Sequence, residues 1–77
     1  MKYGYSLRIA DLNKKADGSL LGVKLGRLCI KNNVPVVEVS TKLGVSRQTV
    51  YNWFTADTYV HKDLADAVKE YVAVLQG

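Results

Sequence analysis

One short stretch of the chain carries side chains that can form paired hydrogen bonds with the edges of nucleic-acid bases. Five polar residues lie on or beside the outward face of a helix expected over about 47–54: Ser46, Arg47, Gln48, Tyr51 and Asn52. An arginine can donate two hydrogen bonds to O6 and N7 of guanine, and an asparagine or glutamine amide can bind N6 and N7 of adenine. Tyrosine can pack on a thymine methyl or reach a phosphate. The set indicates base reading, and the alternative interpretation is an ordinary solvated face.

The sequence around these residues predicts a helix-turn-helix over 36–54. Gly44 suits the left-handed conformation of a tight turn, and Ser46 can cap the helix that follows. Apolar or small residues repeat with helical spacing on both sides of the turn, at Val36, Val39, Ser40, Leu43, Val50, Trp53 and Phe54. The valine-rich run from Val34 to Val39 favours a strand by propensity. The spacing of its buried positions favours a helix, which is the structure we expect.

Length and composition indicate one small globular domain. The chain has 77 residues, of which 48% are hydrophobic and 23% charged, which argues against disorder. No apolar run approaches the roughly 18 residues of a membrane span, and no signal peptide is apparent. The single cysteine, Cys29, fits a reducing compartment, so we expect a cytoplasmic protein. A core of this size is marginal, which favours a homodimer.

The positive charge is concentrated in the part that contains the predicted helix-turn-helix. Residues 1–56 hold nine basic and three acidic side chains, whereas residues 57–77 hold two basic and four acidic ones. A polyanion such as double-stranded DNA is the natural partner of the first part. Residues expected to contact phosphates are Lys42, Thr49, Lys31 and Lys24.

The segments before the helix-turn-helix are less regular. Alternation over residues 3–9 favours a short extended segment, followed by a short helix within residues 7–15. Lys2, Tyr3 and Arg8 could form an arm on DNA, an interface strand or a loose terminus. A helix is expected from Leu20, capped by Ser19, to the asparagine pair 32–33. Its glycines, Gly22 and Gly26, indicate either close approach of another element or sequence drift.

A last helix is expected over about 62–75. Its apolar face consists of Leu64, Ala67, Val68, Tyr71 and Leu75, widened by Val72 and Val74. Tyr71, Val72 and Leu75 are the residues expected at a dimer interface. His61 could cap this helix or touch a phosphate. Trp53 and Cys29 are expected in the core.

From about Leu21 to Trp53 the chain resembles the Cro/C1-type helix-turn-helix domains of phage repressors and related bacterial regulators. The resemblance rests on Leu25, Leu28, Asn33, Val34, Glu38, the run from Leu43 to Ser46, Thr49, Val50 and Trp53. The resemblance implies an all-α bundle of four to five helices that binds operator DNA, usually as a symmetric dimer, in a bacterial cell or a phage-infected host. Ala56 stands where the family commonly has glycine.

These observations favour a small, repressor-like transcriptional regulator that reads double-stranded DNA. Two alternatives stay open: a DNA-binding component of a phage assembly or recombination complex, such as a small terminase subunit, and a protein-interaction module. We expect no catalytic residues, metal, cofactor or small-molecule ligand, because the sequence has neither metal-ligand spacing nor a nucleophile–base set.

Overall fold

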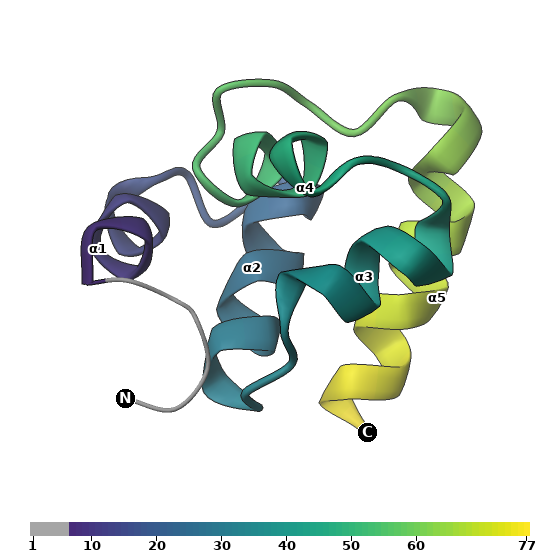
Figure 1. Cartoon of the computed structure of the whole chain (residues 1–77), viewed down its shortest axis with the longest axis horizontal. Helices are drawn as coiled ribbons and strands as arrows, with labels where there is room; N and C mark the ends of the chain where they lie inside the picture. Colours follow the sequence, from purple (N-terminus) through teal and green to yellow (C-terminus); the bar gives the residue numbers. More distant parts are fainter. Residues whose placement is uncertain (1–6) are drawn as a thin grey trace.

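The computed structural model describes residues 7–77, which form an all-α bundle (Figure 1). The helices are α1 (Leu7–Lys15), α2 (Leu21–Lys31), α3 (Val36–Leu43), α4 (Arg47–Phe54) and α5 (Lys62–Gln76). The described part contains no strand, so the expected all-α fold is confirmed. The extended segment expected over residues 3–9 is wrong for Leu7–Ile9, which form the first turn of α1. Its earlier residues lie outside the described part.

Helix α2 lies at the centre of the bundle. It packs against α1 on one side and α5 on the other, and α4 crosses it (Figure 1). Leu25 and Cys29 of α2 are fully buried, together with Val39, Val50, Phe54 and Val68 from the other helices. Trp53, expected in the core, is 3% exposed. The helices around α2 therefore share one apolar core.

Two glycines let α4 approach α2 closely. A Cβ atom on Gly22 would lie 2.7 Å from Cβ of Trp53, and one on Gly26 would lie 2.8 Å from Cγ of Phe54. Carbon atoms in contact are normally about 3.5–4.0 Å apart, so neither site has room for a methyl group. Close approach is therefore the reason for these two glycines.

The predicted turn between α3 and α4 is confirmed. Gly44 has φ of 70° in the left-handed region, and the N–H of Val45 donates to the carbonyl of Ser40 at 3.1 Å. Ser46 caps α4, since its hydroxyl accepts a hydrogen bond from the N–H of Thr49 at 3.1 Å. The run from Val34 to Val39 enters α3 at Val36, with Pro35 as its N-cap, so packing prevails over strand propensity.

The expected cap of α2 is wrong. Leu20 occupies the N-cap position, and both the N–H and the hydroxyl of Ser19 donate instead to the Asp17 carboxylate, at 2.9 and 2.7 Å. These hydrogen bonds lower the pKa of Asp17. Asn32 ends α2 as expected, and Asn33 takes a left-handed conformation with φ of 56°.

Helix α5 begins with a side-chain cap from His61, whose Nδ1 accepts a hydrogen bond from the N–H of Asp63 at 3.1 Å. Val68, Tyr71 and Val72 then face the core. The expected dimer interface is therefore wrong for Tyr71 and Val72, which are only 6% and 7% exposed within the single chain. The sequence of an apolar helix face does not show whether the same chain or a second copy covers that face. Here α2 and α3 of the same chain cover it.

None of the helices in residues 7–77 combines the length and the apolar character needed to cross a membrane.

Candidate nucleic-acid interface

Helix α4 is held from one side and presents polar side chains on the other. Val50, Trp53 and Phe54 are buried, and they fix the orientation of the helix against α2 and α3. Of the five residues expected to read bases, Ser46, Arg47 and Gln48 are exposed, and Tyr51 and Asn52 are half-buried. Ser46 therefore lies at the N-cap of α4, and the other four residues lie on the helix itself, outside its buried face.

Two of these side chains form a pair. Nε2 of Gln48 donates a hydrogen bond to Oδ1 of Asn52 at 2.9 Å, one helical turn further on. The bond orients the Asn52 amide and still leaves its N–H₂ group and one oxygen lone pair free to bind. The two amides can therefore present a preformed set of donors and acceptors.

Ser46 and Thr49 are engaged with each other at the start of α4. Their hydroxyl oxygens lie 2.9 Å apart, and Ser46 also accepts the N–H of Thr49. Ser46 is thus first a cap. Thr49, expected to contact a phosphate, has its hydroxyl in this cap and is half-buried.

The lysines expected to contact phosphates are not gathered around α4. The ammonium of Lys42 lies 5.7 Å from the centre of the Tyr71 ring, which directs it toward α5. Lys31 borders a groove between α1 and α2 together with Lys14 and Arg27. Lys24 is exposed on α2. The structure therefore leaves Arg47 as the basic residue on α4 itself.

Helix α1 flanks the polar face of α4. The sequence did not predict this contact between the two helices. A groove of about 250 Å³ separates the two helices. Arg8 and Leu12 border it from α1, Gln48, Tyr51 and Asn52 border it from α4, and Thr55 borders it from the C-cap of α4. The three α4 residues and the C-cap Thr55 form one stripe with spacing i, i+3, i+4 and i+7, so α1 lies along one edge of the expected base-reading face.

A buried asparagine holds α1 in this place. Asn13 is 2% exposed, and its Nδ2 donates to the carbonyl of Phe54 at 2.8 Å and to that of Val23 at 3.2 Å. The last carbonyls of a helix have no donor within the helix, so a side chain that reaches the end of α4 fits that need. Sequence reasoning missed Asn13 because its partner Phe54 lies 41 residues away. The only signal was Gly26, whose added Cβ would lie 2.6 Å from Nδ2 of Asn13.

Two titratable groups with strongly raised pKa values lie in the core, away from α4's polar face. Burial, with a smaller contribution from the Glu38 carboxylate, raises the pKa of the Cys29 thiol to about 12. Burial also raises the pKa of Tyr71 to about 12, with smaller contributions from Cys29 and Glu38. Both groups are therefore neutral at physiological pH, and neither is a candidate nucleophile.

Within residues 7–77, no three His, Cys, Asp or Glu side chains are grouped so that they could hold a metal ion. Comparison of the chain with protein-family models, with curated proteins and with solved structures gives no match. The function must therefore be inferred from the geometry of α3, α4 and α1.

Proposed function

We propose that this protein binds double-stranded DNA in a sequence-specific manner and acts as a small transcriptional regulator of the repressor type. The observation that carries the proposal is the polar face of α4. Arg47 and Gln48 are exposed and Asn52 is held by Gln48, on a helix whose other face is locked into the core. These are the side chains that discriminate guanine and adenine in the major groove.

In this proposal the N-terminal half of α4 enters the major groove, as recognition helices of helix-turn-helix proteins do. Arg47, in the first turn, binds a guanine. The Gln48–Asn52 pair binds an adenine in the next part of the site, with a free amide N–H donating to N7 and a free amide oxygen accepting from N6. The chemistry is binding alone, and no residue is assigned a catalytic role.

A homodimer would suit this function, because two copies of α4 related by a two-fold axis would read half-sites about 34 Å apart. Tyr71 and Val72 are committed to the core of one chain. The apolar side chains left for a dimer contact on α3 and α5 include Val37 and Val74, which are 52% and 71% exposed. We propose that any dimer uses this surface, and sedimentation of wild type and Val74→Asp measures it.

Selection of bound duplexes from a random DNA library tests the proposed function. The expected result is one enriched sequence, with two-fold symmetry if the protein binds as a dimer. Enrichment of no sequence despite tight binding would favour a DNA-binding part of an assembly, where a ring rather than a dimer would be found by sedimentation. Failure to retain any duplex at low salt would leave a protein-interaction module and refute the proposal.

A further inference from the structure

Helix α1 extends the candidate DNA-binding surface beyond the helix-turn-helix. It lies beside α4 (Figure 1), and the groove between them runs along Gln48, Tyr51, Asn52 and Thr55. A major groove is about 12 Å wide and is bordered by phosphate backbones on both sides. Any element fixed to the flank of a helix in that groove is therefore close to one backbone.

Two anchors fix α1 in this position. Asn13 joins its last turn to the final residue of α4 through the buried 2.8 Å hydrogen bond to the Phe54 carbonyl. Arg27 of α2 donates to the carbonyls of Lys14 and Ala16, at 3.2 and 3.0 Å, just where α1 ends. An element held at its end by both α2 and α4 moves with the recognition helix, so its outer residues have a defined position relative to bound DNA.

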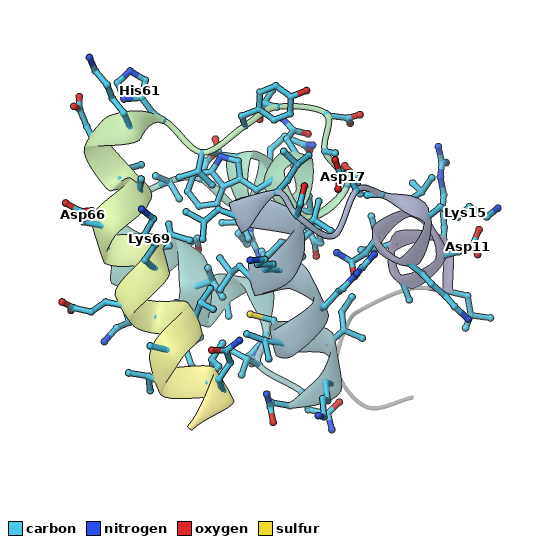
Figure 2. The ribbon with its side chains drawn as sticks, turned by 180° about the vertical axis from the view of Figure 1, so that it is seen from behind. Asp11, Lys15, Asp17, His61, Asp66 and Lys69 are labelled. Atoms are coloured by element: carbon cyan, nitrogen blue, oxygen red, sulfur yellow. The ribbon has the colours of Figure 1, made fainter. Side chains whose placement is uncertain are left out.

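Arg8 is the cation that α1 places at the groove. Its side chain is exposed and borders the groove opposite α4. Among the described residues it has no ion pair, although Asp57 borders the same groove. Lys15, by contrast, pairs with Asp11 at 3.0 Å, and both project from the outer side of α1, away from the other helices (Figure 2).

We propose that α1 is a second DNA-contacting element, in which Arg8 binds a backbone phosphate beside the recognition helix. The inference rests on the proposed function, because it needs α4 in the major groove. Arg8 is an exposed guanidinium at the edge of the reading face, with no ion pair among residues 7–77, and phosphate is the anion that its planar donors fit. Asp57 opposes the same phosphate from the other side of the groove, so it weakens the contact.

The test is binding of wild type, Arg8→Ala, Arg8→Lys and Lys15→Ala to the selected duplex and to an unrelated one, at several salt concentrations. Loss of Arg8 is expected to weaken binding to both duplexes alike, by about three- to tenfold, and to lower the salt slope by about 0.9 per bound protomer. Arg8→Lys should recover most of the affinity and the slope, since the charge is kept. Lys15→Ala removes the same charge from the outer side of α1 and should bind like wild type.

A further variant, Asp57→Asn, is expected to tighten binding to both duplexes, because it removes a carboxylate from the same edge. The inference falls if Arg8→Ala binds like Lys15→Ala, if its loss depends on the base sequence, or if Asp57→Asn has no effect. Arg47→Ala separates this failure from that of the proposed function: if it still alters base preference, α4 reads DNA and only the role of α1 is wrong. Thermal melts of each variant by circular dichroism establish that the fold is retained.

Discussion

The contact between α2 and α4 makes a sharp prediction for Gly22→Ala. In an isolated helix this change would stabilise, because alanine exceeds glycine in helix propensity by about 1 kcal/mol. In this fold the new methyl group would lie 2.7 Å from Cβ of Trp53 and 3.0 Å from its carbonyl oxygen. The carbonyl belongs to the backbone of α4, so a change of rotamer cannot relieve the conflict and the helix itself must move.

The size of the effect follows from these two terms. A carbon–carbon contact of 2.7 Å is short by about 1 Å, and overpacking in a core costs about 1–3 kcal/mol. Because backbone atoms are involved, we take the upper half of that range. After the gain in propensity, Gly22→Ala should lower the free energy of unfolding by about 1–2 kcal/mol, which corresponds to a fall in Tm of roughly 6–12 °C for a domain of this size.

Urea and thermal unfolding followed by circular dichroism measure this change. Lys24→Ala is the matched control, since Lys24 is exposed on the same helix and its loss should change stability by less than about 0.5 kcal/mol. A Gly22→Ala protein with Tm equal to or above that of wild type would refute the packing argument, because propensity alone would then decide the outcome.

Three further predictions concern strain and buried polar groups. Ala56 has φ of 66° in the left-handed region, so Ala56→Gly should raise the free energy of unfolding by about 1 kcal/mol. Gly44→Ala should lower it by about as much, because of its positive φ alone, since nothing lies within 4 Å of the added Cβ. Urea titrations that showed neither change would refute the role of φ. Tyr71→Phe should leave Tm unchanged or raise it, because the buried Tyr71 hydroxyl makes no hydrogen bond of ordinary geometry within residues 7–77. The Glu38 side chain contributes to the raised pKa of Tyr71, so a Tm that falls by several degrees in thermal melts would mean that Glu38 accepts a hydrogen bond from this hydroxyl. The free energy of unfolding should fall as pH rises above about 9. In the unfolded chain Cys29 and Tyr71 lose their protons at the ordinary pKa values of 9.0 and 10.0, whereas burial raises both pKa values to about 12 in the folded state. The folded state therefore binds more protons than the unfolded state over this range, and rising pH favours unfolding. The double variant Cys29→Ala, Tyr71→Phe should show a flatter decline in urea titrations across pH 9–12, and an unchanged decline would contradict this linkage.

The helix-turn-helix could be predicted to the residue because its signals are local. Gly44 sets the turn, Ser46 caps the next helix, and the apolar spacing continues on both sides. The same reasoning misplaced the cap of α2, because the Asp17 carboxylate competes for Ser19 and nothing in the spacing shows which partner prevails. A serine thus predicts a helix start well only where no neighbouring side chain, such as the Asp17 carboxylate, binds that serine instead.

The relation of α1 to α4 could not be predicted, because it depends on a contact between distant residues. Asn13 reads as an ordinary polar residue of a short helix, yet it is buried against Phe54. The candidate base-reading residues were found because they share one helix, whereas Arg8 joins them only through this packing. The expected place of Tyr71 and Val72 was wrong for the same reason, because the apolar character of a residue does not distinguish a core from an interface.

The central claim is that α4 reads base pairs, and competition binding with single-base variants of the selected duplex tests it most directly. Arg47→Ala is compared with Lys69→Ala, which removes an exposed charge on α5 (Figure 2). We expect Arg47→Ala to cost about 1–3 kcal/mol per bound protomer on the preferred duplex and to relax discrimination at one base pair, while Lys69→Ala keeps the preferences of wild type. If Arg47→Ala instead weakens binding to every duplex by the same factor, its guanidinium contacts only the backbone, and the account of α4 as a recognition helix is contradicted.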